Sequence, residues 1–312
     1  MNRSEKIKNY LLNKLGMDLV GIAPAEALAD EPEGRRPTDI LPGAKSIVVF
    51  GKRMSVGAVQ AAMRVHEDGN KYAESIYSTY AADVCPGMVL FFDTFNASQY
   101  IERNYRGTAV PLPLGPMQNG IPVNTELPMF SGPYKAGIPM NINRAALAAG
   151  LGEYGWSNHF LTPEFGPRVV LGAVITNLEL EYDAPYNGRP LCEPDKCGLC
   201  AKLCPVGAIG CVSVENETGI SVPGKSCRVS QFAQNRCSVA AMELPVAAEL
   251  MNKPGGPEDS DIAAAMKKLK INDYTLDHYP KFKCDECLLY CPAGDWEKKY
   301  RARGLSNMKG EG

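Results

Sequence analysis

The stretch CEPDKCGLCAKLCPVGAI, residues 192–209, decides how the second half of this chain is interpreted. Three of its cysteines, Cys197, Cys200 and Cys204, precede Pro205 with the spacing C-x2-C-x3-C-P. This spacing is typical of runs that bind iron-sulfur clusters, which carry one more cysteine three residues before the first of these three. Pro194 stands at that position. At least one ligand must therefore come from elsewhere in the chain.

The stretch CDECLLYCPAG, residues 284–294, repeats the pattern with Cys284, Cys287 and Cys291 before Pro292. In two-cluster ferredoxin modules the cysteine before the proline binds the other cluster, so the two runs must fold against each other. Two four-iron clusters take eight thiolates, and the two runs supply six. The remaining cysteines of this region are Cys192, Cys211, Cys227 and Cys237.

The first cluster can be completed from a cysteine just before the first run. Cys192 is separated from Cys197 by a four-residue spacer that can curl back. It is therefore the nearest cysteine that can supply the ligand missing at Pro194. The first predicted ligand set is Cys192, Cys197, Cys200 and Cys291. Either Cys227 or Cys237 then completes the second set.

Zinc is the alternative metal, because C-x2-C pairs also build four-cysteine zinc sites. Zinc does not explain why both runs end in x3-C-P, and this ending favours iron-sulfur clusters. Cys85 and Cys211 are interpreted as small buried hydrophobic residues rather than ligands.

Composition indicates a globular protein in a reducing compartment. The chain has 312 residues with 45% hydrophobic content, and ten of its eleven cysteines fall between residues 192 and 291. Such clustering points to metal binding rather than disulfides. No apolar stretch approaches the roughly 18 residues of a membrane span, and the N-terminus lacks the plan of a secretory signal, so we expect a cytoplasmic protein. The formal net charge of -2 argues against a nucleic-acid surface.

Hydrophobic periodicity predicts an α+β fold up to about residue 185, followed by a smaller cysteine-rich domain over residues 186–312. A helix capped by Ser4 is expected through Leu15. Strands are expected within residues 18–24, 41–51 and 168–176, and helices around 56–84, 90–105, 143–152 and 259–270.

The stretch GLGEYG, residues 150–155, satisfies the dinucleotide pattern G-x-G-x-x-G. A dinucleotide fingerprint needs a strand before it and a helix after it, whereas here an alanine-rich helix comes before. We interpret the glycines as a helix stop and a close backbone approach.

The chain resembles the epoxyqueuosine reductase and reductive dehalogenase superfamily in the order of its motifs. This order is AAGLGEYGWSNHFLTPEFG, a strand, CGLCAKLCPVGAI, a lone cysteine and CDECLLYCP. The resemblance implies a nitroreductase-like core over residues 1–185 that binds a corrinoid, and a ferredoxin-like domain over residues 186–312 with two [4Fe-4S] clusters. In that family the second cluster takes a cysteine from between the two runs, which favours Cys227 over Cys237. The second set is then Cys204, Cys227, Cys284 and Cys287.

The resemblance also implies an oxidoreductase mechanism. Electrons from a low-potential donor such as ferredoxin or flavodoxin would pass through the clusters to the cobalt of cobalamin or another corrinoid, for reductive cleavage of a carbon-oxygen or carbon-halogen bond. The expected partners are this donor and a small-molecule substrate or a corrinoid protein, with no membrane. The alternative is an electron-transfer protein or a reductive activator of a corrinoid without substrate chemistry of its own.

One departure from the family concerns the proton donor. Epoxyqueuosine reductases carry an aspartate in the loop before the helix that corresponds to NRAALAAG, whereas this loop reads SGPYKAGIP, residues 131–139, without a carboxylate. A tRNA substrate is therefore not favoured. Tyr134 and Lys135 of this loop are the catalytic candidates, and Gly150, Gly152 and His159 are the cofactor-binding candidates.

Overall fold

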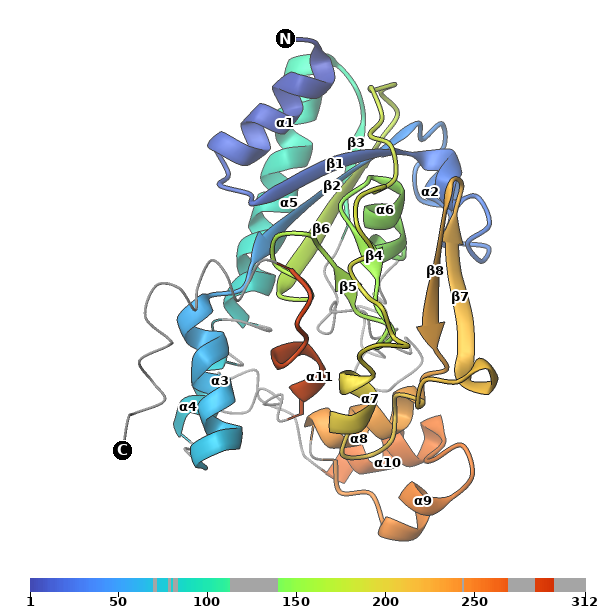
Figure 1. The fold of residues 1–312 in the computed structure, drawn as a ribbon. Helices are drawn as coiled ribbons and strands as arrows, with labels where there is room; N and C mark the ends of the chain where they lie inside the picture. The colour runs from blue at the N-terminus through green and yellow to red at the C-terminus, as the bar shows by residue number, and fades with distance from the viewer. Residues whose placement is uncertain are drawn as a thin grey trace.

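A computed structural model of the chain describes residues 1–69, 72–77, 80, 84–112, 140–242, 244–268 and 284–294. Its fold is α+β, as expected (Figure 1). Four strands form an antiparallel sheet in the order β1-β2-β6-β3: β1 (Leu19–Pro24), β2 (Ser46–Arg53), β6 (Val169–Thr176) and β3 (Ala109–Pro111). The central pair, β2 and β6, is aligned over eight residues from Ser46↔Thr176 to Arg53↔Val169.

The sheet separates two hydrophobic clusters, because successive side chains of a strand point to opposite faces. Ile47 and Val49 belong to the cluster on the side of α6 (Ile142–Ala148). Val48 and Phe50 belong to the other cluster, with residues of α1 (Arg3–Asn13) and α5 (Val84–Tyr105). Figure 1 shows α1 and α5 on one side of the sheet and α6 on the other. The middle layer is thus buried on both faces.

The first helix begins earlier than expected. Asn2, not Ser4, caps α1 in a capping box with Glu5, since the Asn2 side chain accepts a hydrogen bond from the Glu5 amide at 2.8 Å. The Ser4 hydroxyl instead accepts a hydrogen bond from the Glu181 amide at 2.7 Å. Both residues could cap a helix, and the contact with Glu181 engages Ser4 elsewhere.

The helix expected over residues 56–84 is interrupted. The structure has α3 (Val56–Asp68), which ends at Gly69 with φ of 68°, and α4 (Tyr72–Tyr77). α5 runs through the Pro-Gly pair at 86–87, which lies between the helices expected around residues 56–84 and 90–105. A proline in the first turn needs no amide hydrogen, because amides there have no partner within the helix.

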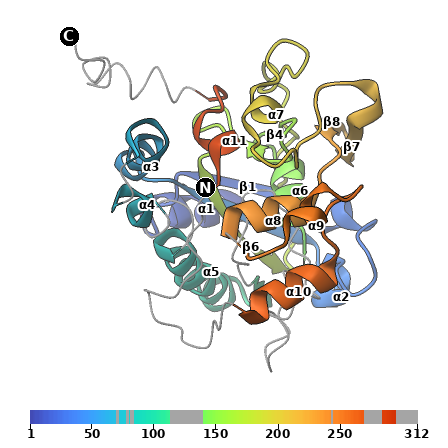
Figure 2. The same cartoon turned by 90° about the horizontal axis from the view of Figure 1, so that it is seen from below.

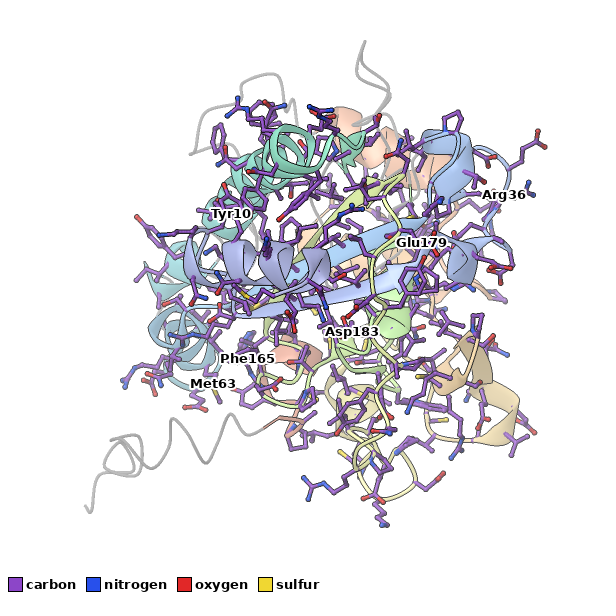
Figure 3. All side chains as sticks on the ribbon, turned by 90° about the horizontal axis from the view of Figure 1, so that it is seen from above. Tyr10, Arg36, Met63, Phe165, Glu179 and Asp183 are labelled. Atoms are coloured by element: carbon purple, nitrogen blue, oxygen red, sulfur yellow. The ribbon has the colours of Figure 1, made fainter. Side chains whose placement is uncertain are left out.

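Short elements complete the first half of the chain. These are η1 (Ala25–Leu28), α2 (Pro37–Ile40) and the hairpin of β4 (Glu153–Tyr154) and β5 (Phe160–Leu161). The segment after β6 returns along the sheet, where Asp183 pairs with Lys8 of α1 at 2.5 Å and accepts the Ile22 amide of β1 at 2.8 Å. Figure 3 labels Asp183 beside α1. This segment leads to the cysteine-rich region.

In the residues that the structure describes, the cysteine-rich region has short helices and one hairpin. Its elements are α7 (Leu199–Leu203), η4 (Val214–Asn216), β7 (Glu217–Val222), β8 (Lys225–Ser230), α8 (Gln234–Met242), α9 (Ala248–Asn252), α10 (Asp259–Lys268) and α11 (Glu286–Leu289). Val222, Cys227 and Val229 of the hairpin join the hydrophobic cluster on the α6 side. α11 contacts both α7 and α3 (Figure 2). The two cysteine runs therefore meet, as expected from their spacing.

Within the described part of the chain, no helix has the length and apolar character needed to cross a membrane.

Candidate metal centre

The first group of cysteines consists of Cys192, Cys197, Cys200 and Cys291. Burial and the nearby Cys192 and Cys291 raise the pKa of the Cys200 thiol to about 12. Burial, together with Cys192 and Cys197, raises the pKa of Cys291 to about 11. Four thiols that influence one another electrostatically lie in one neighbourhood, so the structure brings the first predicted set together.

The second group consists of Cys204, Cys237, Cys284 and Cys287. Burial and Cys204 raise the pKa of the Cys237 thiol to about 12. Burial raises the pKa of Cys284, with Glu286, Cys237 and Cys204 adding to the shift. Burial raises the pKa of the Cys287 thiol, and the neighbouring Cys237, Cys284 and, from the first group, Cys200 add to the shift. The two groups are therefore neighbours.

Cys227 was expected in the second group, and the structure places it elsewhere. Inward and outward residues alternate along β8, and Cys227 is buried in the hydrophobic cluster of the α6 side, where its sulfur accepts the Tyr154 amide at 3.4 Å. The charged groups that influence its pKa are Glu153 and Lys225, not other cysteines. Cys237, on α8, stands near Cys204, Cys284 and Cys287 instead.

The other two cysteines stand apart from these groups. Cys211 is exposed rather than buried as expected, and its sulfur accepts a hydrogen bond from the Asn216 side chain at 3.2 Å. The side chain of Cys85 lies outside the described residues.

Backbone amides point at sulfur atoms in both groups. The Trp156 amide donates to the Cys192 sulfur at 3.4 Å, and the Ala208 amide donates to the Cys204 sulfur at 3.1 Å. Amide donors stabilise the negative charge of a thiolate and tune the potential of a bound cluster. Trp156 follows β4, so the first half of the chain contributes directly to the first group.

The spacing of the sulfur atoms bears on the choice of metal. Among the ten described cysteines, no three sulfur atoms lie within 4.8 Å of one another. A tetrahedral zinc ion with Zn–S bonds of about 2.3 Å holds its sulfur atoms roughly 3.8 Å apart. As placed here, the described sulfur atoms do not form the compact four-sulfur arrangement of a single zinc ion.

A polar cluster adjoins the second run. His66 of α3 approaches both acidic residues between Cys284 and Cys287, with its Nδ1 3.5 Å from Glu286 Oε1 and its Nε2 3.9 Å from Asp285 Oδ1. Burial raises the pKa of Asp285, while hydrogen bonds to His66 and Tyr77 oppose the shift. His66 is exposed, and no local sequence pattern links it to residues so distant in the chain.

The glycines of GLGEYG have packing roles. A Cβ at Gly150 would lie 2.2 Å from the Ala184 carbonyl oxygen, and a Cβ at Gly152 would lie 1.9 Å from that of Leu161. His159 is buried beside Ser157, with 3.0 Å between Nδ1 and the hydroxyl oxygen, and burial lowers its pKa to about 4. Its imidazole is therefore neutral at pH 7.

Tyr134 and Lys135, the catalytic candidates, lie outside the described residues. The cofactor-binding role of Gly150, Gly152 and His159 stays a prediction.

Comparison with known proteins gives local sequence matches, although no family model matches the chain. Epoxyqueuosine reductase of Listeria monocytogenes is 41% identical over 61 residues, which are 20% of this chain and 15% of that protein. Tetrachloroethene reductive dehalogenase of Dehalobacter restrictus is 38% identical over 88 residues, which are 28% of this chain and 15% of that protein. The chain is a distant relative of the epoxyqueuosine reductases and the reductive dehalogenases. The relation is partial, because the matches span only about 15% of the length of these two relatives.

Solved structures of the same two kinds of protein resemble this fold. Epoxyqueuosine reductase from Bacillus subtilis matches with a TM-score of 0.49 and 17% identity, over 91% of this chain and 70% of that one. A catabolic reductive dehalogenase matches with a TM-score of 0.48 and 20% identity, over 85% of this chain and 33% of that one.

Proposed function

We propose that this protein is an iron-sulfur reductase in which two [4Fe-4S] clusters relay electrons to a corrinoid. One cluster would be held by Cys192, Cys197, Cys200 and Cys291, and the other by Cys204, Cys237, Cys284 and Cys287. The observation that carries the proposal is that each group combines cysteines of both runs, with Cys291 and Cys204 exchanged between them. This exchange is the arrangement of two-cluster ferredoxin modules. Residues 186–312 would then form a ferredoxin-like domain, beside a nitroreductase-like core of residues 1–185.

The donor chemistry of the two groups fits such clusters. Several of these thiols have pKa values raised by burial and by their neighbours. Cationic iron favours the thiolate form that metal binding requires, and binding releases the protons. Both runs end in x3-C-P, which favours a cluster over zinc.

The arrangement also supports electron transfer. When bound, the two clusters would supply one-electron chemistry, and the closeness of Cys200 to Cys287 would bring them near each other. A low-potential donor such as ferredoxin or flavodoxin would deliver the electrons. The protein would position the clusters and keep water from them.

The corrinoid rests on the relation to known proteins, one of which is described as performing B12-dependent dehalogenation. The cavity beside Cys192 and Cys227, lined also by Glu153 and Arg228, has a volume of about 330 Å³. This is the lower end of the range for drug-sized ligands, and a corrinoid is larger. This cavity is therefore not proposed as the corrinoid site, and no step of the reaction is assigned to its residues.

The reaction proposed is reductive cleavage of a carbon-oxygen or carbon-halogen bond, with Tyr134 and Lys135 as the source of the proton. A second candidate is an electron-transfer protein or reductive activator without substrate chemistry. The observation that favours it is the absence of a carboxylate from residues 131–139. Turnover of a small-molecule substrate separates the two.

The ligand sets are tested by three matched serine variants of the anaerobically purified protein. We expect Cys237→Ser to lose about half of the iron and sulfide, because one of two four-iron clusters loses a ligand. Cys227→Ser should keep both clusters, and Cys211→Ser, at an exposed site, is the control. Iron and sulfide analysis with EPR of the reduced protein gives the answer. Full loading of Cys237→Ser with depletion of Cys227→Ser would restore the sequence-based assignment, and absence of clusters from the unmutated protein would refute the proposal.

The corrinoid is tested on the same preparation. The protein is incubated with hydroxocobalamin, desalted and examined by EPR for cobalt that stays bound. Retained Co(II) beside [4Fe-4S]⁺ signals supports a corrinoid-dependent reductase. Cluster signals without retained cobalt contradict the corrinoid and leave a ferredoxin-type carrier.

A further inference from the structure

Arg168 is a buried cation between the core and the second cysteine run. It lies between β5 and β6 with only 2% of its surface exposed. Its Nη2 donates hydrogen bonds to the Leu289 carbonyl oxygen at 2.8 Å and to the Cys291 carbonyl oxygen at 2.6 Å. One guanidinium group thus ties the end of α11 and a cysteine of the first group to the segment that leads into the central strand β6.

The backbones pack closely around this contact. A Cβ at Gly166 would lie 2.1 Å from the Ala293 carbonyl oxygen, and a Cβ at Gly294 would lie 2.3 Å from the Gly166 amide nitrogen. Both glycines have positive φ, of 57° and 87°. Phe165, labelled in Figure 3, also adjoins Gly294. The segment from Cys291 to Gly294 is therefore held against residues 165–168 by contacts that admit no side chain.

The charge of Arg168 acts in a poorly solvated place. A guanidinium group stays protonated in proteins, and electrostatic effects strengthen where water is excluded. The hydrogen bond of 2.6 Å to the Cys291 carbonyl oxygen places this positive charge beside a proposed cluster ligand. A cluster gains negative charge on reduction, and nearby charge is one of the factors that set its potential. A fixed cation beside Cys291 therefore stabilises the reduced state more than the oxidised state.

We propose that Arg168 is a positioning residue that holds Cys291 against the core and raises the midpoint potential of the cluster bound by Cys192, Cys197, Cys200 and Cys291. The inference rests on the proposed function, because it requires a cluster at these cysteines. It makes the two clusters unequal, since the described contacts of Arg168 reach a ligand of the first group. Electrons would then be drawn toward the cluster that adjoins the core.

The test is an EPR-monitored redox titration of the full-length, cluster-loaded protein. Arg168→Gln removes the charge, and we expect the midpoint potential of one cluster to fall while that of the other stays unchanged. The affected signal should be the one that is missing from Cys197→Ser. Arg168→Lys keeps a cation but lacks the planar fork that reaches two carbonyl groups, so the same cluster should shift in the same direction by a smaller amount.

A matched control is Arg144→Gln, which removes another largely buried arginine, one that pairs with Asp30 and Glu31 on the α6 side. It should leave both potentials unchanged, which separates a local charge effect from general loosening of the fold. Unchanged potentials in both Arg168 variants, or equal shifts of both clusters, would overturn the inference. Should Arg168→Gln fail to fold, Arg168→Lys decides alone by the same criteria. Absence of clusters from the unmutated protein refutes the proposed function instead, so the two failures are distinguishable.

Discussion

The central sheet and the cysteine-rich region differ in how much of each is buried. All eight residues of β6 are buried, whereas none of the five residues of α7 is. Burial of apolar surface stabilises the sheet, at roughly 25 cal/mol per Å². A five-residue helix is too short to be stable by itself in water. The difference teaches that the sheet is stabilised by its own apolar burial, whereas the short helices around the cysteines bury little and are the part that a bound metal group would stabilise most.

Iron removal should have the largest effect and should separate the two regions. Anaerobic chelation is expected to abolish the cluster signals and to open the backbone around α7 and α11 to hydrogen exchange, because these short helices lose their anchors. The amides of β2 and β6 should stay protected. Equal loss of protection in both regions would show that they form one cooperative unit, against this comparison.

A cavity in the core should weaken the sheet without emptying the metal centre. Phe50 is fully buried, and Phe50→Ala is expected to lower the free energy of unfolding by about 3–5 kcal/mol. Val214→Ala, at a residue that is 88% exposed, is the control and should change it by less than about 0.5 kcal/mol. Denaturant unfolding followed by circular dichroism measures both. Iron content of folded Phe50→Ala should equal that of the unmutated protein, and a matching loss of iron would contradict the separation of the two regions.

The smallest expected effect is a pH dependence of the free energy of unfolding that arises from the buried His159. Burial holds the pKa of His159 at about 4 in the folded protein, below its ordinary value of 6.5. Between these values the unfolded chain binds the proton and the folded chain does not. Stability should therefore fall as pH drops from 6.5 toward 4, by up to roughly 1.4 kcal/mol per pH unit.

Substitution of the imidazole tests this slope. His159→Gln should show a flatter pH dependence of unfolding between pH 7 and pH 5 than the unmutated protein. Ser157→Ala removes the neighbour of Nδ1 but keeps the imidazole, so it should keep the slope. Equal slopes in all three proteins would show that His159 does not titrate in this way.

Local patterns predicted most of the sheet. The strands around residues 18–24, 41–51 and 168–176 appear as β1, β2 and β6, because short apolar β-branched runs fit a sheet that is buried on both faces. The predicted cap of the first helix, Ser4, was wrong. Ser4 and Asn2 are both suited to capping, and the contact of Ser4 with Glu181 decides between them. The helix expected over 56–84 was interrupted at Gly69, whose positive φ ends α3.

The metal centre was predicted in outline from spacing. The spacing of the two runs identified six of the cysteines that the structure gathers, and the short spacer identified Cys192. Cys237 was considered and set aside, and Arg168 was missed. No motif marks an arginine whose partners are carbonyl groups 121 and 123 residues away.

The sequence by itself determined the three longest strands of the central sheet and which cysteines belong to the two runs. Both follow from periods and spacings of a few residues, over which backbone geometry is nearly invariant. Only the tertiary structure sets Cys227 apart from Cys237, and this difference is the basis for proposing Cys237 as the ligand. The β7–β8 hairpin packs on the α6 side and turns Cys227 into the core, whereas α8 carries Cys237 to the second group. That choice depends on how distant segments pack, and no local pattern contains it.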